Sequence, residues 1–377
     1  MRFTDVAMIA AESALLALTA CRDSSAPKGS ALSLTGRLER GCVVAVNATQ
    51  GGNAIDAKSL QLAFTPSDGA SALSDGTIKF LKAGHLTISA TLPDQSVAKL
   101  DVDVAVPPTV VFDMTANGNR DIYKVVLDGA GLSRLTTDPG DDSDPTAAST
   151  GPVVFVSNRD GNAELYSVPL GGGTETRLTT TPSLNERSPQ LSGDGSVLAF
   201  TRDDIGVARV YTATASASSP HALTSGFGTS GTVEVSPALS LHGDSVVFTA
   251  TADGNANLYS TRSTSSSAPT RMLPLSFDSV RVEAAWSRDG KKVAFVAAGA
   301  NTSQLFTYDV QTGAVAKLTN DTQSLGQPAW LADGRLLFTR FGSGQTSLCW
   351  LDPASPSTIT VIPVSGTDPQ HPSGASE

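Results

Sequence analysis

From about residue 30 onward, apolar and polar residues alternate in short runs, without the spacing of an amphipathic helix. Runs such as 42–48 and 99–106 place an apolar side chain at every second position, which is typical of a strand with one buried face. Gly, Pro, Asp and Asn interrupt these runs at short intervals. Sustained helical spacing occurs only within the first twenty residues. The pattern therefore predicts an all-β protein.

The larger, C-terminal part of the chain repeats one pattern six times. Each copy has an apolar strand with a phenylalanine and, eleven residues later, a tyrosine in four copies, Phe306 in the fifth and Cys349 in the sixth. The six phenylalanines are Phe112, Phe155, Phe200, Phe248, Phe295 and Phe338. They lie 43 to 48 residues apart, so the interval varies while the offset of eleven does not. The constant offset predicts a hairpin of fixed geometry, with the variable loops between copies.

Two short strands complete each copy. One follows the tyrosine and usually ends in Leu-Thr, and one of small residues, such as "SPQLS" or "SPALS", precedes the phenylalanine. Four strands in about 45 residues predict one blade of a β-propeller. The recurring aromatic residues are then core residues between blades rather than a binding stripe.

The first copy lacks the short strand before its phenylalanine, because Pro107 and Pro108 lead almost directly into it. At the other end of the chain, "DPQHPS" (368–373) matches "DPTAAS" (144–149) at Asp, Pro and Ser. We therefore expect the C-terminal segment to complete the first blade and to remove a free sheet edge.

The segments "WSRDGKKVAFV", "VVFVSNRDGNAELYSVPLGGGTETRLTT" and "AWLADGRLLFTR" carry a recognisable motif. It resembles the repeats of TolB-like β-propellers, and the resemblance implies a six-bladed propeller over residues 108–373, followed by a tail, 374–377. The third copy departs from the motif at "TRDDIGVARVY", and the sixth has Cys349 at the aromatic position. We expect those two blades to be less regular.

Residues 30–107 form a separate group of short alternating strands. The stretch "DGTIKFLKAGHLTISATLPDQSVAKLDVDVAVPP" resembles the second half of bacterial Ig-like domains. The resemblance implies a small β-sandwich that acts as a spacer or an adhesive module.

The N-terminus reads as an export segment. Residues 1–20 contain an apolar run of signal-peptide length, and "LTAC" resembles the lipobox of bacterial lipoproteins, which implies lipidation of Cys21. A polar tether, 21–29, follows. This predicts a periplasmic protein anchored to the outer membrane, touching the membrane through its lipid only. The alternative is an uncleaved N-terminal helix with an incidental cysteine.

Charge and motifs limit the chemistry. A formal net charge of -10 argues against nucleic acid as a partner. The sequence contains no "G-x-S-x-G" nucleophile motif, and its histidines fall at different repeat positions, so we expect no enzyme, catalytic residue, metal or cofactor. The acidic loop 138–145 lacks the calcium-loop spacing and reads as solvated charge, with calcium binding as the alternative.

The loops of a propeller converge on its axial face, where partners usually bind. The residues expected there are Asp144, Glu186, Arg187, Glu234, Arg281, Glu283, Gln327 and His371. The TolB-like resemblance implies an envelope protein as partner, and we expect a monomer. The alternative is a glycan-binding or degraded carbohydrate-active propeller that uses Trp286, Trp330 and His371 in its channel. A spacer without a specific ligand is a third possibility.

Overall fold

The computed structural model describes residues 30–149, 151–204, 207–224, 227, 232–252, 255–264, 268–274, 283–298 and 302–375. Within them the only helical element is the short 3-10 helix η1 (Ala57–Ser59), and the prediction of an all-β protein is confirmed. No helix of this part of the chain has the length and apolarity needed to cross a membrane. The expected signal segment, Cys21 and the tether lie outside the described residues.

The chain divides into two units, residues 1–107 and 108–377. The strands described in the first unit are β1 (Ala31–Thr35), β2 (Val43–Gln50), β3 (Asn53–Ile55), β4 (Gln61–Thr65), β5 (Ala70–Ala72), β6 (Thr77–Phe80), β7 (Gly84–Thr91) and β8 (Val97–Val104). They form two antiparallel sheets, one with the order β1-β2-β6-β5 and β3 paired to β2, the other with the order β4-β7-β8.

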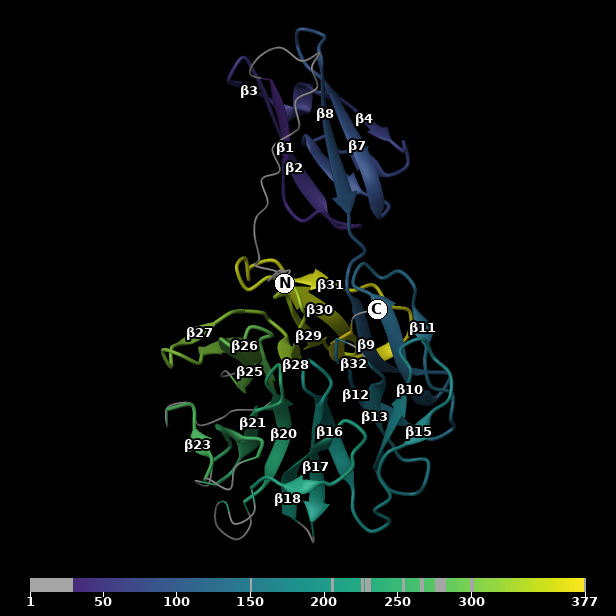
Figure 1. Cartoon of the computed structure of the whole chain (residues 1–377), viewed down its shortest axis with the longest axis vertical. Helices are drawn as coiled ribbons and strands as arrows, with labels where there is room; N and C mark the ends of the chain where they lie inside the picture. Colours follow the sequence, from purple (N-terminus) through teal and green to yellow (C-terminus); the bar gives the residue numbers. More distant parts are fainter. Residues whose placement is uncertain are drawn as a thin grey trace, which may run out of the picture. The chain divides into compact units, whose positions relative to one another are not determined.

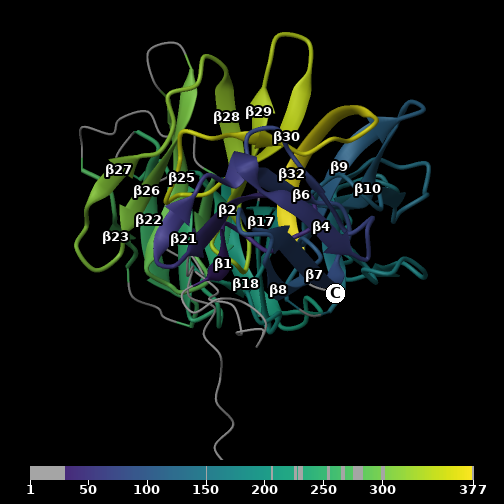
Figure 2. The same ribbon diagram turned by 90° about the horizontal axis from the view of Figure 1, so that it is seen from above.

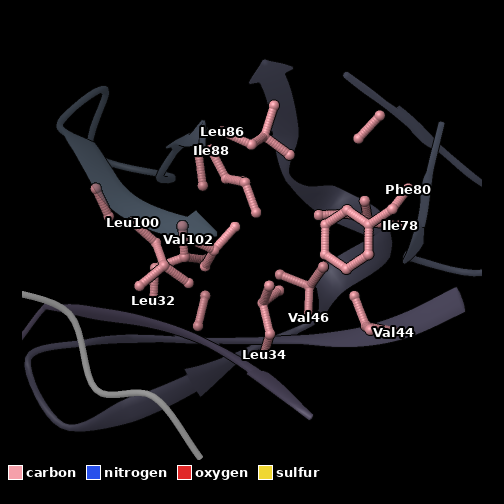
Figure 3. Packing of buried hydrophobic residues seen from close by; sticks show 14 of the residues in the cluster. Leu32, Leu34, Val44, Val46, Ile78, Phe80, Leu86, Ile88, Leu100 and Val102 are labelled. Atoms are coloured by element: carbon pink, nitrogen blue, oxygen red, sulfur yellow. The ribbon is translucent and has the colours of Figure 1, made fainter. Parts of the chain in front are cut away.

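One hydrophobic core joins the two sheets of this unit. Burial alternates strictly along β8, as a strand with one solvent-facing side requires. Figure 3 shows Leu34 and Val46 of the larger sheet directed toward the same core as Ile88 and Leu100 of the smaller sheet. Each fully buried aliphatic side chain contributes about 1.5–3 kcal/mol to folding, so these residues hold the sheets together.

The second unit consists of six four-stranded antiparallel sheets. The first has the order β11-β10-β9-β32, and the others follow in sequence as β12–β15, β16–β19, β20–β23, β24–β27 and β28–β31. Their bounds are β9 (Thr109–Ala116), β10 (Asn119–Val126), β11 (Ser133–Arg134), β12 (Asp142–Thr146), β13 (Val153–Ser157), β14 (Glu164–Val168), β15 (Thr176–Arg177), β16 (Glu186–Leu191), β17 (Val197–Asp204), β18 (Val207–Thr214), β19 (His221–Ala222), β20 (Glu234–Leu239), β21 (Ser245–Ala250), β22 (Asn257–Arg262), β23 (Thr270–Arg271), β24 (Ala284–Trp286), β25 (Lys292–Ala298), β26 (Ser303–Asp309), β27 (Val315–Lys317), β28 (Ser324–Trp330), β29 (Leu336–Phe341), β30 (Thr346–Leu351), β31 (Thr360–Val361) and β32 (Thr367–Ala375).

The offset of eleven residues corresponds to direct cross-strand neighbours. In every sheet the repeated phenylalanine faces its partner across the hairpin, as Phe200 faces Tyr211 and Phe338 faces Cys349. The ring centroids of the five aromatic pairs lie 5.5–6.2 Å apart. All six phenylalanines are fully buried, which confirms the prediction that they are core residues.

The C-terminal strand completes the first sheet, as expected from the repeat. Strand β32 pairs with β9, and the two lie side by side in Figure 1. Each sheet contacts the next one along the chain, and the sixth contacts the first through β28, β29 and β30 against β32. Figure 2 shows β32 between β30 and β9.

The third and sixth sheets are more regular than expected. The hairpin β17–β18 pairs over its whole length without a register shift, and so does β29–β30. In the third sheet the guanidinium of Arg202 lies 3.8 Å from the centroid of the Tyr211 ring, as that of Arg159 lies 4.4 Å from the Tyr166 ring in the second. The divergent motif therefore keeps the stacking interaction that stabilises the hairpin.

Candidate functional site

The inner strands of the six sheets, β32, β12, β16, β20, β24 and β28, converge on one pocket. Each sheet contributes one residue to a ring around it. The ring residues are His371, Asp144, Ser188, Ser236, Glu283 and Gln327. We call this site the axial pocket.

The backbone explains why these side chains point inward. Five of the six ring residues precede a proline and have φ between 48° and 55°, Glu283 being the exception. Each of the five lies where the pairing register of the inner strand shifts, and such a bulge re-aims a side chain. Left-handed φ is unfavourable for residues other than glycine, and proline disfavours helical conformations before it. The same strained conformation thus recurs at one position in five sheets.

An ion-pair network supports the pocket at the first and second sheets. The Asp113 carboxylate is fully buried and accepts a hydrogen bond from Arg120 Nε at 2.6 Å. His371 Nδ1 lies 3.0 Å from Asp113 Oδ1, and its Nε2 lies 3.2 Å from Asp144 Oδ1. Burial by itself would lower the pKa of His371, but the charges of Asp113 and Asp144 outweigh it and raise the pKa to about 9. The imidazole is therefore an imidazolium at neutral pH.

Hydrogen bonds link neighbouring ring residues. The backbone N–H of Gln327 donates to the Glu283 carboxylate, and Gln327 Oε1 accepts from the backbone N–H of His371 at 3.0 Å. Between the second and third sheets, the backbone N–H of Ser188 donates to Asp144 Oδ2 at 3.4 Å. The ring is thus joined from the fifth sheet through the sixth, first and second to the third.

The axial pocket presents hydrogen-bond acceptors between apolar walls. Asp144 and Glu283 supply carboxylates, and five proline rings, Pro145, Pro189, Pro237, Pro328 and Pro372, line the wall. Both nitrogens of His371 face carboxylates, so neither is available as a base toward Ser188 or Ser236. The arrangement favours hydrogen-bond donors and cationic groups.

Asp113, Asp144 and His371 place ligand atoms within 4.8 Å of one another, the separation that a metal site needs. Such a site requires a neutral imidazole, however, and an ion would have to displace the proton that His371 shares with the two carboxylates. The three side chains form two ion pairs, with one nitrogen of His371 facing Asp113 and the other facing Asp144.

The structure brings together four of the predicted face residues: Asp144, Glu283, Gln327 and His371. It does not place Glu186 or Glu234 on the face, since their side chains are 1% and 0% exposed. Glu186 accepts a hydrogen bond from Thr181 Oγ1, and Glu234 pairs with Arg209, because both lie two residues before a bulge and turn into the sheet interface.

Burial raises the pKa of Glu186 to about 7, and the nearby charge of Glu164 adds to the shift. Arg187 is exposed and faces Asp203 at 3.6 Å. Arg281 lies outside the described residues.

Ser188 and Ser236 were missed as ring residues, although a signal for them exists. Each ring residue of five sheets stands immediately before the proline of its inner strand.

The position before the proline also corrects the alignment of the C-terminal segment. His371-Pro372, not Asp368-Pro369, occupies the place of Asp144-Pro145, because Gln370 and Ser373 flank the bulge in β32 as Ser143 and Thr146 do in β12.

The carboxylates of the acidic loop 138–145 do not converge on one point. Asp142 pairs with Arg159 at 3.0 Å, Asp141 accepts from the backbone N–H of Arg120, and Asp138 accepts from that of Gly140. Asp144 belongs to the axial pocket. These carboxylates are thus engaged by Arg159, by the backbone of Arg120 and by the loop's own backbone.

Comparisons with known proteins give the fold a name. Residues 107–233 match the family model of the TolB beta propeller domain. TolB from Acinetobacter baumannii is similar in structure, with a TM-score of 0.61 and 16% identity over 82% of both chains. Putative TolB from Agrobacterium tumefaciens has a TM-score of 0.55 and 15% identity over 69% of this chain and 91% of its own. No curated protein sequence matches the chain. The second unit therefore has the fold of a TolB-like β-propeller, and residues 107–233 also match that family in sequence.

The expectation that the protein is not an enzyme is not upheld. Structures of the same fold include Kuenenia stuttgartiensis hydrazine synthase, with a TM-score of 0.58 and 14% identity over 71% of this chain and 46% of that one. A puromycin-hydrolyzing peptidase from Mycobacterium tuberculosis is also similar, with a TM-score of 0.47 and 15% identity over 82% of this chain and 53% of that one. The likeness to hydrazine synthase shows that this fold occurs within an enzyme, so the fold does not exclude catalysis.

Proposed function

We propose that this protein is a periplasmic lipoprotein whose propeller binds another protein of the cell envelope at the axial pocket. In this proposal Cys21 carries the outer-membrane anchor, residues 30–107 form an Ig-like spacer, and the six sheets are the blades of one ring. The likeness to TolB structures supports the propeller and is consistent with an interaction scaffold in the periplasm. The lipobox-like sequence supports export and lipidation.

The observation that carries the proposal is the ring of strained residues. Left-handed φ costs roughly 1–2 kcal/mol per residue that is not glycine, and five ring residues adopt it. A fold that needed only stability would place glycine there or omit the bulge. Strain of this kind persists where the surroundings enforce it and concentrates at binding and catalytic sites. Here it directs five different side chains into one pocket at the point where all the sheets meet.

In-cell photocrosslinking tests this proposal. A photoreactive residue at Gln327, which lines the pocket, should capture one envelope protein in full-length, lipidated protein. Pull-down with the double variant Glu283→Gln/Gln327→Ala should lose the same protein. The double variant Asp128→Asn/Gln311→Ala, which changes loops away from the pocket, should retain it. A partner recovered equally with both variants, or no specific partner at all, would reject the axial pocket as the interaction surface.

The carbohydrate hypothesis loses the observation on which it depended. Trp330 is 9% exposed, packs with Phe338 and Cys349, and donates its indole N–H to the carbonyl of Ala285 at 3.1 Å. Trp286 packs against the cluster that contains Val293 and Phe295. The rings are thus core residues between sheets rather than a free stacking platform.

A further inference from the structure

A second pocket lies further along the same inner strands. Three residues beyond each residue of the axial ring stands a residue that lines it: Ala147, Leu191, Leu239, Trp286, Trp330 and Gly374. The two pockets share Gln190 and Pro328 in their walls, so they follow each other along the strands. The polar ring is thus succeeded by an apolar one.

A single arginine reaches into this apolar surrounding. Arg288 belongs to the turn "SRDG" between β24 and β25, whose counterparts read "SGDG" in the third sheet, "SLHG" in the fourth and "LADG" in the sixth. Its Nη1 donates to the backbone carbonyl of Gly193 at 2.7 Å and to Ser149 Oγ. The guanidinium therefore extends from the fifth sheet to the second and third. A Cβ at Gly193 would lie 2.9 Å from Nη1, so the glycine makes room for it.

Arg288 differs from the other partly buried arginines of the propeller. Arg120, Arg159, Arg202 and Arg209 each pair with a carboxylate, whereas no carboxylate among the described residues pairs with Arg288. Among the described residues, no acidic side chain lines the pocket. Its Nε and Nη2 donors make no hydrogen bond within the described part of the chain. An arginine stays protonated in a protein, so a positive charge is held here without a counter-charge from the residues that the structure describes.

A further donor without a partner stands in the same wall. The indole N–H of Trp286 is buried and makes no hydrogen bond to any described residue, unlike that of Trp330. An unmade hydrogen bond of a buried donor costs about 1–3 kcal/mol. The pocket thus combines a guanidinium fork, an unused indole donor and a wall of leucine, alanine and tryptophan.

We propose that this pocket, which we call the Arg288 pocket, binds a small organic carboxylate with an apolar hydrocarbon part. The carboxylate accepts two parallel hydrogen bonds from the guanidinium, the geometry that arginine favours. The hydrocarbon part lies against Leu191, Leu239 and Trp286. The described lining of the pocket holds no acidic side chain that would compete for the guanidinium, and the apolar ring selects against strongly hydrated anions. This site is independent of the protein partner proposed for the axial pocket.

Titration with hexanoate and with hexanamide, its neutral counterpart, tests the proposal on the full-length protein. The readout is the indole N–H resonance of Trp286, assigned by its loss in Trp286→Phe. Hexanoate should shift this resonance with saturation, and hexanamide should bind about tenfold more weakly or worse, since it cannot pair with the charge. Equal affinities, or no shift of the Trp286 resonance, would overturn the proposal without recourse to any variant of Arg288.

Substitution then locates the charge. Arg288→Met removes the charge but keeps an unbranched side chain, and should lower the affinity for hexanoate by about tenfold. The control Arg262→Met, which changes an exposed arginine on β22, should leave the affinity unchanged. The unfolding temperature of both variants is measured alongside. A folded Arg288→Met protein that binds hexanoate as tightly as the wild type would also overturn the proposal.

Discussion

The imidazole of His371, on the last strand, lies 3.0 Å from the carboxylate of Asp113, on the first strand of the propeller, 258 residues earlier in the sequence. The same imidazole reaches Asp144 on the neighbouring sheet at 3.2 Å. One side chain therefore ties the two ends of the repeat to each other and to the second sheet. When the imidazole is protonated its positive charge lies between the two carboxylates, and when it is neutral only Arg120 remains to balance Asp113.

This pair predicts a pH-dependent stability. The pKa of His371 rises from 6.5 to about 9 on folding, so its stabilising effect is complete below pH 6.5 and is lost as the pH rises through about 9. With a side chain 30% exposed, we expect a loss of roughly 2 kcal/mol between these limits. Urea unfolding of wild type and His371→Gln at pH 6, 7.5 and 9 measures it. The two curves should converge at high pH, and parallel curves would contradict the prediction.

Substitution of Glu186 should change the stability of the fold in the direction opposite to that of His371→Gln. Its pKa is raised from 4.5 to about 7 by burial, so the folded protein holds a proton that the unfolded chain has released, and this stabilisation is lost as the pH rises from 4.5 through 7. Glu186→Gln should therefore be more stable than wild type at pH 8, by about 1–3 kcal/mol. Thermal unfolding at pH 5 and pH 8 measures the difference.

Its neighbour Glu164 is the matched control. Burial opposes its charge, but hydrogen bonds from Thr179, Thr181 and Arg177 outweigh burial and lower its pKa. Glu164→Gln should therefore destabilise the protein at pH 8. If both glutamines stabilise, the distinction between the two buried acids is wrong.

The strain at the ring predicts which side chains Ser188 tolerates. At a φ of 48°, glycine relieves the strain and a β-branched residue increases it. We expect Ser188→Gly to be neutral or up to about 1 kcal/mol more stable, and Ser188→Val to be about 1–2 kcal/mol less stable. Chemical denaturation compares them, with the same two substitutions at Ser245 in β21 as control. There the order should reverse, because an extended strand favours valine over glycine.

The thiol of Cys349 should be unreactive in the folded protein. It is fully buried opposite Phe338, and burial raises its pKa to about 12. In Cys21→Ser protein at pH 8, N-ethylmaleimide should modify the half-buried Cys42 and leave Cys349 unmodified until denaturant is added. Mass spectrometry of peptides follows both sites. Modification of Cys349 at the rate of Cys42 would contradict its packing.

The repeat made most of the propeller predictable. A constant offset of eleven residues between Phe112 and Tyr123, and in every later copy, can arise only if the two residues face each other across a hairpin. Even the Leu-Thr ending has a structural reason: the hydroxyls of Thr136, Thr179 and Thr319 each accept a hydrogen bond from a backbone N–H of the third strand of the sheet, β10, β14 or β26. Pairing between strands that are close in sequence therefore produces a residue pattern that recurs in every copy.

The site was predictable only in part, because a bulge breaks the period on which such reasoning depends. Glu186 and Glu234 were expected on the axial face as residues of the loops ahead of the inner strands, but both acids are buried, and the register shift lies at Ser188 and Ser236, which line the pocket. Asp113 and Arg120 were beyond reach, since their role depends on a strand that arrives 248 to 258 residues later.

Because β32 pairs with β9, the first sheet of the propeller can be completed only after the other five have been synthesised. While the chain is being made, β9 has its partner β10 but lacks the strand that will cover its other edge. That edge stays open until the last residues arrive, and closing so long a loop is slow. A chain in this state offers an unpaired strand to any neighbour. The propeller is therefore most in need of a chaperone just before it is finished, and least once Ala375 has reached Thr109.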